Sequence, residues 1–106
     1  MAELDDLKQR LRSFATARDW EQFHTPKNLA MALVAEAAEV VEHFQWLTAG
    51  ESQALDAGQR AEVALELADV LLYLVMLADR LDLDLGEAAR RKIALNEERF
   101  PPATRP

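Results

Sequence analysis

The sequence predicts an all-α protein, with one four-helix bundle-like domain over residues 1–106. Only three Gly and four Pro occur in 106 residues, so few positions interrupt a helix. Ala, Leu, Glu and Arg, which favour helices, dominate the composition. Half of the residues are hydrophobic, and many recur at helical spacing. A chain of this length and composition builds a single modest core, so we expect no second domain.

The first two helices are predicted in the N-terminal half of the chain. Leu4, Leu7 and Leu11 recur at helical spacing, which predicts a helix over residues 4–18. The loop DWEQFH follows. Thr25 offers a hydroxyl as an N-cap and Pro26 occupies the first helical position, where its missing N–H does no harm. The second helix is therefore predicted to begin at Pro26 and to end near residue 47.

The last two helices follow a polar connection over residues 50–58. A third helix is predicted over residues 59–81. Asp84 and Glu87 have the spacing of a capping box, which predicts the start of a fourth helix. That helix should end before the tail PPATRP, and we expect residues 101–106 to be frayed.

Two pairs of acids interrupt apolar stretches of the second and third predicted helices. Residues 63–78 are apolar except for Glu66 and Asp69, and Glu36 and Glu39 have the same spacing in LAMALVAEAAEVV. A carboxylate removed from water costs several kcal/mol unless it is protonated, paired or bound to a metal. Residues three apart in a helix point to one side, so each pair can hold one ion. Four acids without a neighbouring Lys or Arg predict a cation site.

Helical geometry adds further residues to this site. Glu62 and Tyr73 lie on the same stripe as the acids of the third helix. On the fourth helix, Lys92, Asn96 and Arg99 fall within about 60° of one another. Carboxylate oxygens suit Mg²⁺, with Mn²⁺ as the alternative, and a stripe of basic and amide groups suits phosphate oxygens. The two stripes together indicate a metal with a phosphate-bearing ligand.

Charge and composition exclude several classes of function. The net charge of -7 argues against a nucleic-acid polymer as partner. The chain has no Cys, which fits a reducing compartment. The N-terminal segment lacks the apolar core of a signal peptide, and the longest apolar stretch is too short and too acidic to span a bilayer. We therefore expect a cytoplasmic protein that has no membrane partner.

An ordered set of motifs resembles one known family. EAAE at residues 36–39 and ELAD at residues 66–69 match the ExxE and ExxD signature of the MazG-like all-α nucleoside triphosphate pyrophosphohydrolases. RDWEQFHTPKNLA, FQW, DVLLYLV and KIALNEERFP are similar to the dCTP pyrophosphatase branch. The resemblance implies Mg²⁺-dependent hydrolysis of a nucleoside triphosphate to the monophosphate and pyrophosphate. The implied substrate is dCTP or a modified cytosine deoxynucleotide, and the implied assembly is a homotetramer, a dimer of dimers.

The resemblance also assigns roles to individual residues. Those that match the family's metal ligands are the four acids, Glu36, Glu39, Glu66 and Asp69. Those that match its nucleotide-binding residues are Trp20 and Trp46 around the base, and Tyr73, Lys92 and Asn96 at the phosphates or sugar. The chain departs from some relatives in having Leu11 where they carry His, and Ala38 in place of a glycine between two acids. These departures bear on base preference more than on the chemistry.

The same motifs imply a mechanism. An activated water attacks the α-phosphorus and pyrophosphate leaves with Lys92 near its oxygens, because this chemistry depends on positioning and charge neutralisation. A carboxylate of the Glu36 and Glu39 pair accepts the proton of the water. The near-continuous apolar surface of residues 63–78 independently predicts self-association, since one domain covers only one stripe of a helix.

Other interpretations remain open at this point. Taken alone, the tryptophans and Tyr73 are more often core residues, and the Lys92 stripe is more often a solvated face. His24 and His43 are expected to be neither catalytic nor ligands. A di-iron bundle requires a Glu-x-x-His pairing, whereas His43 lies four residues after Glu39. The alternative functions are hydrolysis of dUTP or another non-standard nucleotide, and a non-catalytic helical protein that binds a partner.

Overall fold

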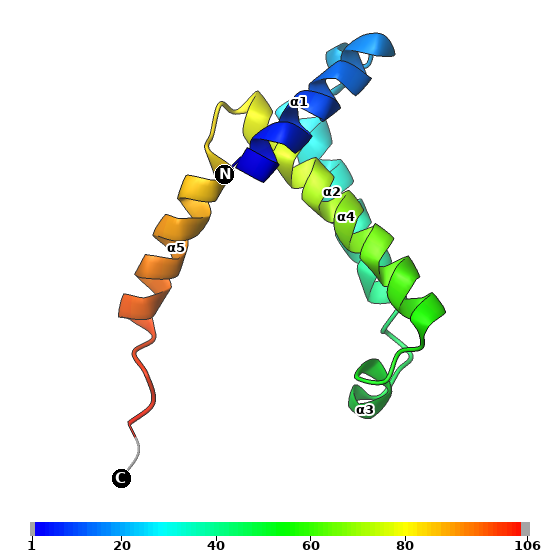
Figure 1. The fold of residues 1–106 in the computed structure, drawn as a ribbon, viewed down its shortest axis with the longest axis vertical. Helices are drawn as coiled ribbons and strands as arrows, with labels where there is room; N and C mark the ends of the chain where they lie inside the picture. The colour runs from blue at the N-terminus through cyan, green and yellow to red at the C-terminus, as the bar shows by residue number, and fades with distance from the viewer. Residues whose placement is uncertain (1, 105–106) are drawn as a thin grey trace.

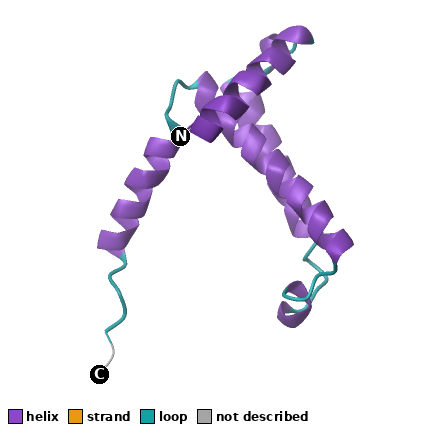
Figure 2. Ribbon diagram, viewed as in Figure 1, coloured by secondary structure: helices purple, strands orange, loops and turns teal. Residues whose placement is uncertain are grey.

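The computed structural model describes residues 2–104, and helices and loops make up all of this part of the chain (Figures 1 and 2). The predicted all-α class is confirmed. In chain order the elements are α1 (Ala2–Ala17), the 3-10 helix η1 (Glu21–Phe23), α2 (Pro26–Glu42), α3 (Ala49–Ser52), α4 (Ala57–Arg80) and α5 (Leu85–Arg99).

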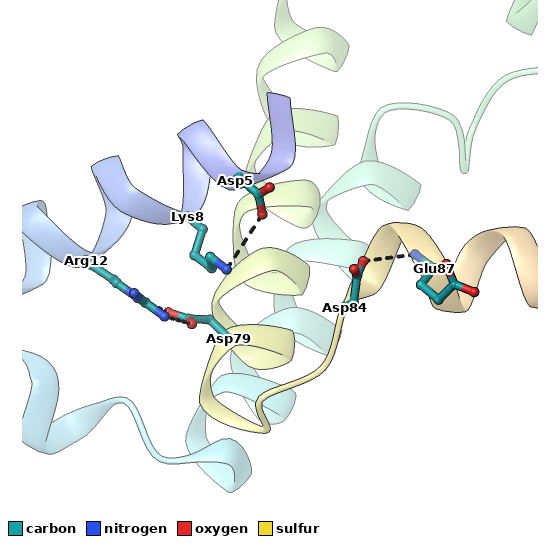
Figure 3. A network of polar contacts seen from close by, with 6 residues as sticks. All are labelled: Asp5, Lys8, Arg12, Asp79, Asp84 and Glu87. Atoms are coloured by element: carbon teal, nitrogen blue, oxygen red, sulfur yellow. Dashed lines mark hydrogen bonds and ion pairs between the residues drawn. The ribbon is translucent and has the colours of Figure 1, made fainter. Parts of the chain in front are cut away.

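Two predicted helix starts are present. The Thr25 hydroxyl accepts a hydrogen bond from the backbone N–H of Asn28 at 3.2 Å, and α2 begins with proline as expected. Asp84 accepts from the backbone N–H of Glu87 at 3.0 Å (Figure 3). The Glu87 carboxylate accepts from Arg90 instead of closing the capping box. α5 therefore begins at the predicted place with half of the predicted motif.

Two helix boundaries differ from the prediction. α2 ends at Glu42, about one turn early, and the following residues form turns up to Thr48. Thr48 and Glu51 form a reciprocal capping box that begins the short helix α3 inside the expected polar connection. Asp56 and Gln59 form a second capping box, so α4 begins two residues before the predicted start at residue 59. These capping boxes set where α3 and α4 begin, because they satisfy backbone N–H groups at the start of each helix that have no partner within the helix.

α2 and α4 pack side by side, and α1 lies across the C-terminal part of α4 (Figure 1). The buried apolar residues of the described chain are Ala15, Leu29, Val63, Val75 and Ala78. α5 extends away from the other helices, and only its first turn contains a buried residue, Gly86. One chain therefore forms an open arrangement of five α-helices and a 3-10 helix over residues 2–104, in contrast to the four-helix bundle-like domain that we expected.

The single chain is more expanded than a compact domain of its size. Its radius of gyration is 17.3 Å, whereas a compact domain of this length has about 13 Å. Its accessible surface is 8437 Å², whereas about 5,900 Å² is typical for its mass. Only part of the apolar surface of residues 63–78 is covered within one chain, since Val63, Val75 and Ala78 are buried whereas Leu65 is 70% exposed and Leu67 is also exposed. Apolar surface that would normally be covered is thus left open.

A bidentate ion pair between Arg12 and Asp79 connects α1 to α4. Arg12 donates from Nε to Asp79 Oδ2 at 2.8 Å and from Nη2 to Asp79 Oδ1 at 2.5 Å (Figure 3). These hydrogen bonds lower the pKa of Asp79, and the Asp79 side chain is mostly buried whereas that of Arg12 is half exposed. This bidentate pair joins residues that are 67 apart in sequence, so it fixes how α1 crosses α4.

Asp79→Asn is expected to lower the melting temperature at pH 7 by roughly 4–8 °C, because the amide carries no charge and keeps only one of the two oxygens that accept from Arg12. The folded pKa of Asp79 lies below its unfolded value of about 3.9, so the pair stabilises above that pH. Its contribution is lost as the pH falls through the lowered folded pKa. Melting curves of the variant and parent should therefore converge below about pH 4. Asp5→Asn, which removes an exposed pair with Lys8, should change little at any pH.

None of the helices described between residues 2 and 104 combines the length and the hydropathy needed to cross a bilayer.

Candidate active site

The pairing of α2 with α4 gathers three of the four predicted acids. Carboxylate oxygens of Glu36, Glu39 and Glu66 all lie within 4.8 Å of one another. The two glutamates of α2 share one side of that helix because they are three residues apart. Glu66 comes from the facing side of α4. The predicted convergence of the two helices' acids is therefore present for these three residues.

Asp69 lies beside this cluster. It is exposed, and its carboxylate is outside the three-residue group defined by the 4.8 Å separation. Its negative charge still contributes to the raised pKa values of Glu36 and Glu66. The fourth predicted acid is thus close enough to act on the cluster electrostatically.

Two carboxylate oxygens of the cluster are buried without a partner. Among residues 2–104, Glu36 Oε2 and Glu66 Oε2 are inaccessible to solvent and receive no hydrogen bond. Burial, followed by the hydrogen bond and charge of Glu39, raises the pKa of Glu36. For Glu66 the hydrogen bond with Glu39 raises the pKa most, followed by burial. Buried acceptors that repel one another fit a divalent cation, which would supply the missing positive charge.

His43 lies next to the cluster, although from the sequence we expected it to be neither catalytic nor a ligand. It caps the C-terminus of α2, and its Nε2 lies 3.8 Å from Glu66 Oε1. Its charge acts against the other causes and lowers the pKa of Glu66. The available signal was its spacing of four residues from Glu39, which places both side chains on one face of α2. The di-iron motif requires a spacing of three residues, which His43 does not have relative to Glu39.

The two tryptophans lie at opposite ends of α2. Trp20 stands between α1 and η1, 45% exposed, with its ring edge-on to Phe14 at 5.6 Å and to His24 at 6.5 Å. Trp46 follows the C-terminus of α2 and is 87% exposed. The 17 residues of α2 span about 25 Å, so one chain keeps the two rings apart. Neither ring is buried in a core within the chain.

The remaining predicted residues lie on α4 and α5. Tyr73 is half-buried on α4, and Glu62 is exposed near the start of the same helix. Lys92, Asn96 and Arg99 are exposed on α5, which points away from the α2 and α4 pair (Figure 1). The predicted basic stripe and the acid cluster are therefore both present, but one chain does not bring them together.

A cavity of about 310 Å³ lies between α1, η1 and the C-terminal part of α4. Leu11, the position where some relatives carry His, contributes to its wall, together with Arg12, Asp79 and Arg80. The acid cluster lies further toward the N-terminal end of α4. This cavity is thus adjacent to the loop that carries Trp20 and separate from the acids.

The pairing of two helices that brings three carboxylates together defines this chain as an all-α protein with a candidate site for a divalent cation. Residues 31–103, which contain both acid pairs, match the MazG-like family. This match covers more than half of the chain. The chain belongs to the MazG-like family, and the family resemblance expected from the motifs is confirmed.

Similar proteins include named enzymes. The chain is 47% identical to human dCTP pyrophosphatase 1 and 46% identical to the rat protein of the same name, in each case over 100 residues. These matches cover 92% of this chain and 59% of each relative, so the chain spans less than two thirds of their length. A crystal structure of a pyrophosphatase from Archaeoglobus fulgidus is similar with a TM-score of 0.88 and 39% identity, covering 94% of both chains.

Proposed function

We propose that this chain hydrolyses a nucleoside triphosphate, dCTP or a modified cytosine deoxynucleotide, to the monophosphate and pyrophosphate with Mg²⁺ as cofactor. The observation that carries the proposal is the carboxylate cluster with two buried, unpartnered oxygens, on Glu36 and Glu66. The similarity to proteins named dCTP pyrophosphatase 1 supports the reaction and the cytosine nucleotide. Mn²⁺ is the alternative ion, because it prefers the same oxygen ligands.

The acids and the basic stripe have separate tasks in this reaction. Glu36, Glu39, Glu66 and Asp69 hold the cation. When bound, the cation neutralises the triphosphate and polarises its phosphoryl oxygens. A carboxylate of the Glu36 and Glu39 pair accepts the proton of the water that attacks the α-phosphorus.

Lys92 and Asn96 are assigned to the phosphates of the nucleotide. They lie on α5, away from the acid cluster of their own chain, so the proposal requires α5 to reach the cluster of a second chain. The expanded shape and exposed apolar residues of the single chain support such an arrangement. We propose a homotetramer built as a dimer of dimers, with each site completed at a contact between chains, and with Tyr73 beside the nucleotide.

Trp20 and Trp46 are proposed to enclose the base, also from different chains. Stacking on an aromatic ring contributes roughly 1–3 kcal/mol per base. Replacing either Trp by Ala is expected to raise KM for dCTP about tenfold or more, since 1.4 kcal/mol is a factor of ten. Steady-state kinetics check this. Phe23→Ala is the matched control, since Phe23 is also an exposed aromatic residue of the loop. Parental kinetics in both Trp variants would exclude the tryptophans from the base pocket.

A panel of nucleoside triphosphates tests the proposed function. Pyrophosphate release is measured with Mg²⁺, with Mn²⁺ and with chelator, using dCTP, 5-methyl-dCTP, dUTP, dTTP and CTP. We expect release with a divalent ion and the highest kcat/KM for a cytosine deoxynucleotide. A preference for dUTP would retain the reaction and replace the substrate. Release from none of them would favour the alternative, a non-catalytic helical protein that binds a partner.

A further inference from the structure

The loop between α1 and α2 presents Trp20 and is fixed locally by the two helices that flank it. The backbone N–H of Trp20 donates to Ala15 O at 3.0 Å, and Asn28 Nδ2 donates to Phe23 O at 3.0 Å. Asp19 adopts a positive φ of 56°, which turns the chain sharply at the end of α1. These bonds define the shape of the loop. They do not define where the loop lies relative to α4.

Arg80, the last residue of α4, makes that second connection. Its Nε donates to His24 O at 2.7 Å and its Nη2 donates to Glu21 O at 2.6 Å. The two carbonyls belong to the first residue of η1 and to the residue that caps it. The planar guanidinium of Arg80 therefore binds both ends of η1. Arg80 lies 56 residues after His24 and 59 residues after Glu21 in the sequence.

The two hydrogen bonds from Arg80 fix the orientation of η1 as well as its distance from the end of α4. A single hydrogen bond would leave η1 free to rotate about the contact, whereas two bonds from a rigid fork prevent it. His24, whose carbonyl Arg80 holds, also places its ring edge-on to Trp20. Trp20 also lies edge-on to Phe14, and the Arg18 guanidinium lies 3.5 Å from the Phe14 ring centroid. Trp20 thus has two edge-on aromatic neighbours, and nearly half of its surface is exposed.

We propose that Arg80 is a positioning residue for the nucleotide base, acting through the η1 loop on Trp20. The inference rests on the proposed function, because it assigns the open face of Trp20 to base stacking. α4 also carries Glu66, Asp69 and Tyr73, so an anchor at its end places the tryptophan relative to the helix of the acids. Arg80 itself does not touch the nucleotide, since its fork is occupied by backbone carbonyls.

The test compares Arg80→Lys and Arg80→Met with Arg60→Lys, which changes an exposed arginine in the first turn of the same helix. Lys keeps the charge and one hydrogen bond but cannot span both carbonyls, whereas Met keeps neither. The variants are made in the parent and in a Trp46→Phe background. Because the chain has two tryptophans, Trp20 is then the only one, and its acrylamide quenching reports the order of the loop without nucleotide.

We expect the Trp20 quenching constant to rise about twofold in Arg80→Met, to rise less in Arg80→Lys, and to be unchanged in Arg60→Lys. In the parent background KM for dCTP should rise about tenfold in Arg80→Met, an effect of the size of one lost stacking contact, with kcat within about twofold. The rise in KM should be smaller in Arg80→Lys than in Arg80→Met. Circular dichroism melting is recorded for each variant, and kinetics are measured well below the lowest melting temperature.

Several results would overturn the proposal. Parental quenching in both Arg80 variants would mean that the local bonds alone order the loop. Increased quenching with parental KM would mean that the order of the loop does not affect binding of the nucleotide base. A fall in kcat at constant KM would place Arg80 in the chemical step instead. If no nucleotide is hydrolysed by the parent, the proposed function fails, and quenching still shows whether Arg80 orders the Trp20 loop.

Discussion

Glu66→Gln is expected to reduce the turnover of dCTP by about 10³-fold or more while the chain remains folded. Glutamine has the shape of glutamate but carries no charge. Glu66 contributes the carboxylate that α4 brings to the two glutamates of α2. Its loss removes a proposed cation ligand, and Glu66 is the one acid of the three-residue cluster that comes from the facing helix. The measurement is pyrophosphate release under saturating Mg²⁺.

Stability should change in the opposite direction from activity. The folded state raises the pKa of Glu66, so an ionised Glu66 opposes folding at neutral pH in the absence of a cation. This opposition disappears as the pH falls through the raised pKa. In EDTA the variant should therefore melt at the same temperature as the parent or higher. Mg²⁺ should raise the melting temperature of the parent by linkage, and raise that of Glu66→Gln less.

Glu42→Gln is the matched control, because Glu42 is an exposed acid at the end of α2. It should retain parental turnover and the parental response to Mg²⁺. Parental turnover in Glu66→Gln itself would remove the carboxylate cluster from the active site. A variant that is both inactive and unfolded would be replaced by Glu36→Gln, which tests the other buried oxygen.

Leu65→Lys is expected to dissociate the assembly and to abolish dCTP hydrolysis with it. Leu65 is among the most exposed large apolar residues of the chain, on the helix that carries Glu66. If another chain covers it, a lysine there would have to be buried at a cost of several kcal/mol. An increase of about 10²-fold or more in the dissociation constant follows from a cost of about 2.8 kcal/mol.

Sedimentation at micromolar concentration measures this effect. The parent should sediment as an oligomer, and Leu65→Lys should approach the 11.9 kDa of one chain. Gln9→Lys, at an exposed polar position of α1, should sediment and react like the parent. A parent that is a stable, active monomer would contradict the completion of the site by a second chain. An active monomeric variant would do the same.

The acid cluster was predictable because its signal is local and chemically costly. Two acids three residues apart share a side of a helix, and an apolar setting demands compensation, so the sequence alone identified Glu36, Glu39 and Glu66. The N-caps at Thr25 and Asp84 were predictable for a similar reason, since the capping residue and the backbone that it satisfies are three positions apart.

Features that depend on long-range packing were not predictable. The spacing of Asp84 and Glu87 predicts where α5 begins, but it does not say that this helix extends away from the other helices of its own chain. The contact between His43 and Glu66 requires the register of α2 against α4, which no local pattern encodes. The bond from Arg80 to the η1 loop joins residues 56 positions apart. Thr48 and Glu51 carry a local signal for the start of α3, and a helix that begins there limits how far α2 can extend.

Hydrolysis of dCTP in H₂¹⁸O tests the central claim most directly. If the carboxylate cluster supports attack of water on the α-phosphorus, the parent with Mg²⁺ should give dCMP with one ¹⁸O and unlabelled pyrophosphate, both identified by mass spectrometry. Chelator and Glu66→Gln should each suppress both products. Label in pyrophosphate, formation of dCDP and phosphate, or equal product formation by Glu66→Gln would contradict the account.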